Sequence, residues 1–238
     1  MRLRGTWYLL ILFIPGLIIG KDPIDKAISK NLNTIIDLRH QIHQYPELGN
    51  REFKTAKLVA EHLRGLGIEV ETNIAYTGVV GVLKGTKPGP VVAVRADMDA
   101  LPVTEETDLP FKSTVKTTYL DKEVGVMHAC GHDIHTSVQL GVASVLASMK
   151  RSLPGTVKFI FQPAEEGPPP GEEGGAELML KEGVFDNPKP SAVFGLHTHA
   201  ALEVGELGLT IGPAMAAVDQ FIITIKGKQS HGAYPHKS

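Results

Sequence analysis

The chain has 238 residues, enough for one full domain and part of a second. Its composition, with 42% hydrophobic and 21% charged residues, is that of an ordinary globular protein. The net charge of −2 gives no indication of the basic surface that nucleic acids require, so no nucleic-acid partner is expected.

Residues 1–20 form a segment of their own. Arg2 and Arg4 precede an apolar run from Trp7 to Ile19, and Gly20 ends it. A basic start, a short apolar run and a small residue at the boundary are typical of a secretory signal peptide. The run is short for a membrane-spanning helix, which needs about 20 apolar residues. We therefore expect an exported protein (periplasmic, secreted or lumenal), or one anchored in a membrane if the segment stays uncleaved.

Helical and strand patterns alternate between residues 21 and 211, which we treat as one domain. Apolar residues recur with helical spacing from 24 to 42, and glycines stop a second predicted helix that starts at about residue 52. The later predicted elements are strands at 68–70, 79–83, 91–95, 156–161 and 192–197, and helices at 138–149 and 172–181. This alternation predicts an α/β fold with a mixed, largely parallel sheet flanked by helices.

The pattern changes at about residue 212. Phe221, Ile223 and Ile225 alternate with more polar neighbours, which predicts a half-buried strand. A glycine-rich loop with His231 follows it. One strand and one loop cannot form a domain, so we expect 212–238 to be the start of a second, incomplete domain.

The only cysteine, Cys130, lies in the stretch 127–135 together with three histidines. A lone cysteine cannot form a disulfide within the chain, so its role is packing, nucleophilic attack or metal ligation. Cys130 and His132 would supply a thiolate and an imidazole, which zinc favours. The alternative is a small buried side chain beside a core histidine. The polar neighbours make that alternative weaker.

Polar side chains also follow three predicted strands. Asp97 and Asp99 follow the third strand, Glu165 and Glu166 follow the fourth, and His197 ends the fifth. Ligand sites of parallel sheets gather beyond the carboxyl ends of the strands. Near a metal, one of two adjacent acids can bind the ion while the other accepts a proton. Taken singly, each group has an ordinary alternative: Glu165 and Glu166 a solvated acidic pair, Asp97 and Asp99 a cap or turn after the strand, and His197 a core histidine at a strand end.

Several motifs together point to one family. They occupy residues 38–43, 45–48, 95–102, 127–135, 162–167, 195–197 and 230–236. In content and order they resemble the M20 metallopeptidase family, in particular its amidohydrolase branch of N-acyl-amino-acid amidohydrolases, hippurate hydrolases and auxin-conjugate hydrolases. The resemblance covers nearly everything after residue 20.

The resemblance implies a catalytic α/β domain over 21–211 that holds two divalent metal ions. By motif position, the expected metal ligands are Cys130, His132, Glu166 and His197, and Glu165 is the expected general base. The ions implied are zinc or manganese, with cobalt and nickel as alternatives. The implied reaction is hydrolysis of the amide bond of N-acyl amino acids by a metal-activated water.

The family also implies a smaller lid domain that begins at 212 and forms a homodimer in full-length members. His231 is expected to reach the partner's active site and stabilise the oxyanion, and Asp99 to orient the metal site. Family members continue further and supply one more histidine ligand, so we expect a truncated chain. Two alternatives stay open: a metal-binding fragment without activity, and a thiol hydrolase in which Cys130 is the nucleophile.

Overall fold

The computed structural model describes residues 22–215, 221, 223–224 and 226–237. The predicted signal segment, 1–20, lies outside the described residues. The chain divides into two compact units after Thr198. None of the helices in the described ranges is long and apolar enough to cross a membrane.

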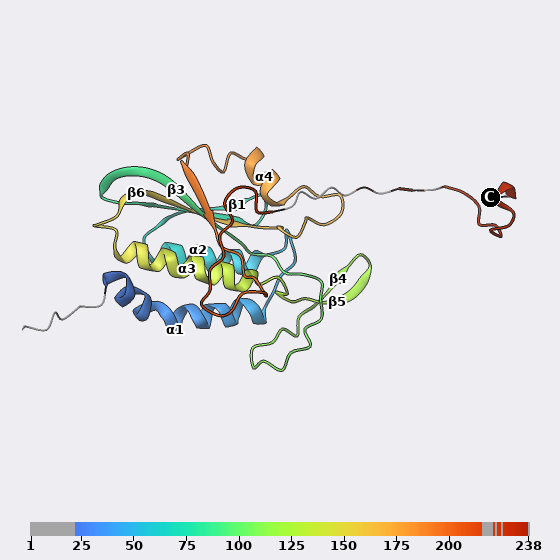
Figure 1. Ribbon diagram of the computed structural model, residues 1–238, viewed down its shortest axis with the longest axis horizontal. Helices are drawn as coiled ribbons and strands as arrows, with labels where there is room; N and C mark the ends of the chain where they lie inside the picture. The colour runs from blue at the N-terminus through green and yellow to red at the C-terminus, as the bar shows by residue number, and fades with distance from the viewer. Residues whose placement is uncertain (1–21, 216–220, 222, 225, 238) are drawn as a thin grey trace, which may run out of the picture. The chain divides into compact units, whose positions relative to one another are not determined.

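The first unit is an α/β structure (Figure 1). Its elements, in chain order, are α1 (Pro23–Gln44), α2 (Phe53–Gly65), β1 (Glu69–Ile74), β2 (Gly78–Lys84), β3 (Lys87–Asp97), β4 (Lys116–Tyr119), β5 (Lys122–Gly125), α3 (His132–Ser148), β6 (Pro154–Gln162), α4 (Gly175–Lys181) and β7 (Ala192–Gly195). The main sheet has the order β1-β2-β6-β3-β7, and β4 and β5 form a separate hairpin.

The main sheet is mixed. β3 pairs in parallel with both β6 and β7, whereas β2 pairs antiparallel with β1 and β6. The carboxyl ends of β3, β6 and β7 therefore meet at one edge of the sheet. The predicted mixed sheet with flanking helices is confirmed, and its parallel half carries the predicted site residues.

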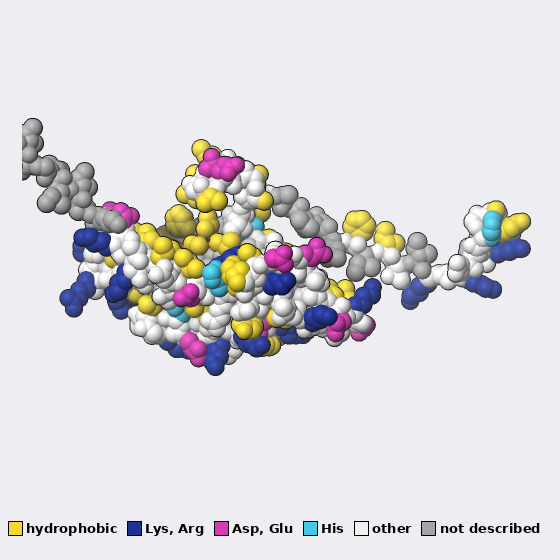
Figure 2. Space-filling model, turned by 90° about the horizontal axis from the view of Figure 1, so that it is seen from below, with side chains coloured by type: hydrophobic (Ala, Val, Ile, Leu, Met, Phe, Trp, Pro, Cys, Tyr) yellow, Lys and Arg dark blue, Asp and Glu magenta, His cyan; other side chains and the backbone are white. Residues whose placement is uncertain are grey.

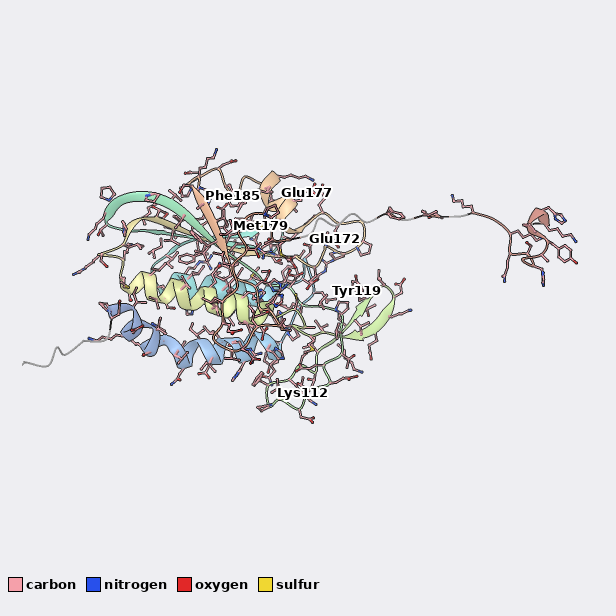
Figure 3. The ribbon with its side chains drawn as sticks, in the orientation of Figure 1. Lys112, Tyr119, Glu172, Glu177, Met179 and Phe185 are labelled. Atoms are coloured by element: carbon pink, nitrogen blue, oxygen red, sulfur yellow. The ribbon has the colours of Figure 1, made fainter. Side chains whose placement is uncertain are left out.

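Helices α1, α2 and α3 lie on one side of the sheet and α4 on the other (Figure 1). Successive strand residues face opposite sides, so β6 serves both layers. Phe159 and Phe161 belong to the core under the helices, whereas Ile160 packs with Met179 of α4. Met179 and Phe185 lie over this second face in Figure 3.

Helix α1 has apolar residues on two sides. Ile35 and Leu38 pack against the core. Ile24, Ile28 and Leu32, four residues apart, are about half exposed, at 46%, 47% and 50%. The side of the molecule on which α1 lies mixes apolar with acidic and basic side chains (Figure 2). The helical spacing in this segment therefore predicts the helix correctly but not which side is buried.

Some predicted bounds are wrong. α3 begins at His132, not at residue 138. Its first turn is polar and buried, so it lacks the apolar pattern from which the helix is predicted. α4 begins at Gly175 rather than 172. The β4–β5 hairpin is not among the predicted elements.

The second unit, 199–238, is described by itself. It contains a short 3-10 helix, Pro235–Lys237. Phe221 and Ile223 are 81% and 75% exposed and lie outside any strand, so the predicted half-buried strand is not seen at these two residues. Ile225 lies outside the described residues. The start of a lid domain at 212 stays a prediction.

Candidate active site

Helix α3 begins inside the cysteine cluster. Gly131 is the residue before the helix and has a φ of 93°, in the left-handed region that side chains disfavour. A Cβ at Gly131 would also collide with the hydroxyl of Thr198. This hydroxyl donates a hydrogen bond to the Cys130 carbonyl, at 3.1 Å. The absence of a side chain at Gly131 thus lets Thr198, three residues after the end of β7, pack against the turn that carries Cys130 and His132.

His132 lies at the centre of the site and is fully buried. Its Nδ1–H donates to the Asp99 carbonyl oxygen at 2.8 Å. Its Nε2 is buried and has no hydrogen-bond partner within the described part of the chain. Oxygens of Asp97 and Glu165 lie 3.7 Å from this nitrogen, and one of Glu166 lies at 3.8 Å. Nε2 therefore faces three carboxylates at distances too long for hydrogen bonds.

Cys130 and His197 form the second part of the site. The Sγ of Cys130 lies 3.5 Å from the Nε2 of His197. The Nδ1–H of His197 donates to the carbonyl oxygen of Thr198, at 2.6 Å. This bond leaves Nε2 with its lone pair directed toward the sulfur. His197 itself follows the last residue of β7, Gly195, by two positions.

The loop after β6 carries Glu165 and Glu166. The backbone N–H of Glu166 donates to Oδ2 of Asp99 at 2.9 Å, and Oδ1 of Asp99 lies 3.3 Å from Nδ1 of His132. Asp99 therefore contacts both the His132 ring and the glutamate loop. The prediction that Asp99 orients the site agrees with these contacts, although its role stays a prediction.

Asp97 and His135 complete the buried part of the site. Nδ1–H of His135 donates to Asp97 at 2.6 Å, and Nε2 of His135 accepts the Thr198 N–H at 2.8 Å. Arg95 donates to the other Asp97 oxygen, at 2.6 Å. From the sequence, Asp97 is expected only among the polar residues beyond the third predicted strand, and neither Asp97 nor His135 is assigned a role of its own. The signal was present: Asp97 is two residues from Asp99 on the strand, and His135 is one helical turn from His132.

Burial and a surplus of negative charge together shift several pKa values in the site. Burial lowers the pKa of His132, but the hydrogen bond to Asp99 and the charge of Asp97 outweigh it and raise the pKa to about 9. Burial, with the Asp97 charge, raises the pKa of Glu165. Burial, followed by the charge of Glu166, raises the pKa of the Cys130 thiol to about 12. A thiolate at Cys130 therefore requires a cation beside it.

These side chains fit a divalent metal. The described residues offer three groups of converging ligand atoms, which are Cys130, His132 and His197; His132, Glu165 and Glu166; and Asp97, His132 and His135. Atoms bound to one zinc ion at about 2.0–2.3 Å are separated from each other by about 3–4 Å, the range seen for Cys130 and His197. Thiolate, imidazole and carboxylate are also the ligand types that zinc takes. The Nε2 of His132, buried and without a hydrogen-bond partner in the described residues, is placed to ligate such an ion.

The sequence pattern of peptidase family M20/M25/M40 matches residues 93–237. The chain belongs to this family. The match includes every site residue discussed above, from Asp97 to His197.

Relatives of this M20 protein support the assignment. Thermostable carboxypeptidase 1 of Saccharolobus solfataricus is 48% identical over 86% of the chain and 49% of its own length. N-acyl-L-amino acid amidohydrolase of Geobacillus stearothermophilus is 42% identical over 92% of the chain and 55% of its own length. The Bacillus subtilis YXEP protein, described as a dinuclear metal binding peptidase from the M20 family, is 42% identical with a TM-score of 0.64, over 76% of this chain and 46% of that one. The chain thus spans about half the length of the curated relatives it matches.

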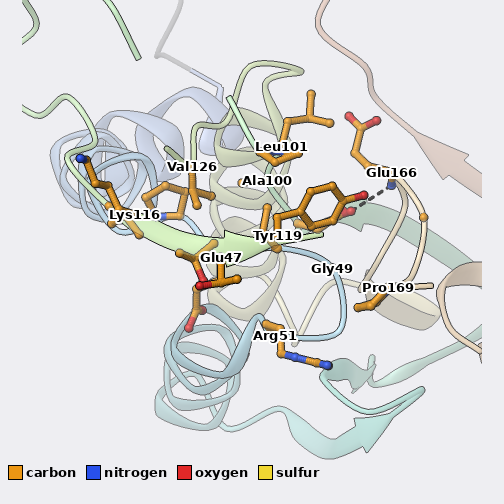
Figure 4. Close-up of a pocket in the computed structure, with 18 of the residues that line it drawn as sticks. Glu47, Gly49, Arg51, Ala100, Leu101, Lys116, Tyr119, Val126, Glu166 and Pro169 are labelled. Carbon is orange, nitrogen blue, oxygen red and sulfur yellow. Dashed lines mark hydrogen bonds between the residues drawn. The ribbon is translucent and has the colours of Figure 1, made fainter. Parts of the chain in front are cut away.

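A cavity of about 570 Å³ adjoins the M20 site. Glu166 lies at one edge of it and Lys116 of the hairpin at the opposite edge (Figure 4). Leu101, Tyr119 and Pro169 are among its lining residues. The cavity therefore has a mixed apolar and polar lining next to the glutamate loop.

A second buried network holds the start of α3. The Asp133 carboxylate accepts from Nε of Arg39 at 2.8 Å and from Nδ1 of His43 at 2.9 Å. His43 also contacts Glu105, at 3.1 Å. These bonds tie α1 to the turn that carries His132.

The structure brings together six of the seven predicted site residues. These are Asp99, Cys130, His132, Glu165, Glu166 and His197. Their individual roles stay predictions. His231 lies in the second unit, where Ala233 N–H donates to its Nδ1 at 3.2 Å, and its relation to the site stays a prediction.

Proposed function

We propose that the protein hydrolyses the amide bond of N-acyl amino acids to a carboxylic acid and an amino acid, with Glu165 as general base. The observation that carries the proposal is the unpartnered Nε2 of His132, faced by the carboxylates of Glu165 and Glu166. The family membership and the amidohydrolase relative support the reaction class.

The residues that would hold two divalent ions are Cys130, His132, Glu166 and His197. Ions bound there supply Lewis acidity and lower the pKa of water toward 7. Zinc suits the thiolate best, and manganese, cobalt or nickel suit the imidazole and carboxylate ligands. Asp99 holds both the His132 ring and the Glu166 backbone, so it orients two of the ligands.

Glu165 is the proton carrier in this proposal. It accepts a proton from water as the oxygen–carbon bond to the amide carbonyl forms. It then delivers that proton to the amide nitrogen as the carbon–nitrogen bond breaks. Burial and Asp97 raise its pKa, which improves proton delivery to the leaving amine. Glu165 is about one-third exposed, so water and substrate can reach it.

We also propose that His231 donates a hydrogen bond to the oxyanion in a homodimer. Its Nδ1 accepts the Ala233 N–H, which leaves Nε2 as the nitrogen that carries the proton. Oxyanion stabilisation by such donors is a large contribution in acyl transfer.

The 3.5 Å contact between Cys130 and His197 is the observation that favours a thiol hydrolase instead. However, the charges of Glu165, Glu166 and Asp97 all oppose a thiolate at Cys130 unless a cation is bound. Ligation of a metal agrees better with these surroundings.

The test compares Glu165→Gln with wild type after loading with zinc, manganese or cobalt, on N-acetyl amino acids and hippurate. Glu165→Gln should lose about 100-fold or more in kcat, because general acid–base catalysis contributes about 10²–10⁴. Glu173→Gln is the matched control, since Glu173 is exposed and pairs with Lys181.

A chelator should abolish the activity and added metal should restore it. Activity that survives the chelator but is lost on alkylation of Cys130 would establish the thiol hydrolase. A folded chain that binds metal but hydrolyses none of these amides would leave the metal-binding fragment as the correct alternative.

A further inference from the structure

Glu52 is a fully buried acid that the mechanism above does not use. It occupies the N-cap position of α2, where a short polar side chain is preferred and a negative charge is favourable to the helix dipole. Glu52 makes no such cap. Glu47 fills that role instead, accepting the backbone N–H groups of Lys54 and Thr55, each at 2.9 Å. Helix α2 therefore does not explain why residue 52 is a glutamate.

The Glu52 carboxylate faces the glutamate loop. Oε1 accepts the backbone N–H of Ala164 at 2.7 Å, and Oε2 accepts the hydroxyl of Thr77 at 2.5 Å. The described residues give it no ion-pair partner. Burial of an unpaired carboxylate costs free energy, so its position calls for a reason beyond packing.

Ala164 directly precedes Glu165 and has a φ of 46°. This left-handed conformation is unfavourable for a residue with a Cβ. Ala164 is buried, and its N–H bonds to Glu52. Two residues later, the Glu166 N–H bonds to Asp99. The loop is thus held at two backbone N–H groups by two buried carboxylates, with Glu165 between them.

The loop also packs closely against the segment that precedes Glu52. A Cβ at Gly49 would lie 2.8 Å from the Gly167 carbonyl oxygen and 3.1 Å from Ala164. Gly49, three residues before Glu52, therefore packs directly against the turn that Glu52 holds.

We propose that Glu52 is a positioning residue, which holds Ala164 in its left-handed conformation and thereby directs Glu165 and Glu166 toward the metal site. The proposal rests on the proposed function, because it assumes that Glu166 binds metal and Glu165 acts beside it.

The test is a cobalt(II) titration of the full chain, followed by absorption. Glu52→Ala should weaken cobalt binding by about tenfold or more, as loss of groups that orient ligands typically does. The d–d bands should change because Glu166 is displaced. The thiolate-to-cobalt band should persist, because Cys130 and His197 lie outside the loop. A general loss of structure would remove both signals.

Two further variants make the comparison specific. Glu52→Gln keeps an oxygen that accepts the Ala164 N–H, so it should bind cobalt within about threefold of wild type. Glu182→Ala is the matched control: Glu182 accepts the Ala75 N–H at 2.6 Å, the same kind of bond but to a residue outside the glutamate loop. It should bind cobalt like wild type.

A folded Glu52→Ala variant with wild-type affinity and spectrum would overturn the proposal. So would a tenfold loss in Glu52→Gln or an equal loss in Glu182→Ala. The Gln variant has the shape of the native side chain, so it tests the proposal even if Glu52→Ala does not fold. If wild type itself binds no cobalt, the proposed function fails first, and this outcome is distinct from the others.

Discussion

Gly131 shows at the scale of one residue how backbone conformation and close packing set the site. Its φ of 93° and its contact with Thr198 both exclude a Cβ. Gly131→Ala should lower the free energy of unfolding by about 1–3 kcal/mol, the usual cost of a strained backbone residue. It should also weaken cobalt binding, because Cys130 and His132 flank it. Urea unfolding and cobalt titration measure the two effects.

Gly67→Ala is the control for this substitution. Gly67 also has a positive φ, 71°, but a Cβ there meets nothing within 4 Å. It should therefore lose some stability while its cobalt affinity stays at the wild-type value. Equal effects of both variants on cobalt binding would refute the link between Gly131 and the site.

Glu52 should make stability depend on pH. Burial raises its pKa from 4.5 to about 7, although hydrogen bonds from Thr77 and Ala164 oppose the shift. An acid whose pKa is raised in the folded state stabilises the fold when it is protonated. The contribution of Glu52 to the free energy of unfolding is therefore complete below pH 4.5 and is lost as the pH rises toward 7. The free energy of unfolding should fall by about 3 kcal/mol over this range, which is the free-energy equivalent of the pKa shift.

The measurement is urea unfolding of metal-free wild type and Glu52→Gln between pH 4 and about 8. The difference between the two curves isolates Glu52, because other titrating groups such as Asp97 are common to both. The stability of wild type relative to Glu52→Gln should fall as pH rises through this window. Parallel curves would show that Glu52 has an ordinary pKa.

At the scale of elements, the sequence correctly predicts the strands that have a clear apolar pattern. The runs that become β3, β6 and β7 are apolar, and their carboxyl ends place Asp97, Glu165 and His197 together. The start of α3 is missed because its first turn buries His132, Asp133 and His135, which breaks the apolar period that identifies helices.

The β4–β5 hairpin is missed for a different reason. Its strands are mostly exposed, so they lack the alternation that marks a half-buried strand. Its turn places Leu120 and Asp121 at positive φ, 49° and 62°. Leucine is a poor indicator of such a turn, where glycine or asparagine is usual. The sequence also does not predict that Glu52 is buried, because an acid before a helix suggests an exposed cap.

At the scale of the whole molecule, the site joins segments that are distant in sequence. Cys130, Glu166 and His197, three of the proposed metal ligands, come from three separate loops. Ions held by these ligands would bind the folded chain in preference to the unfolded one. At a concentration 100 times Kd such an ion should add about 2.7 kcal/mol of stability. For a chain of this size, that corresponds to a rise in Tm of about 5–10 °C.

The neighbouring histidines 197 and 199 provide the sharpest test of this coupling. The ring of His197 lies 3.5 Å from Cys130, whereas the His199 ring accepts a local hydrogen bond from Ala201. His197→Ala should therefore lose most of the zinc-induced rise in Tm, and His199→Ala should keep it. Each variant is melted with chelator and with zinc, so that its own effect on the metal-free fold is subtracted. If both variants keep the full rise, the ion binds elsewhere, because a ligand can stabilise the folded state only through groups that contact it there.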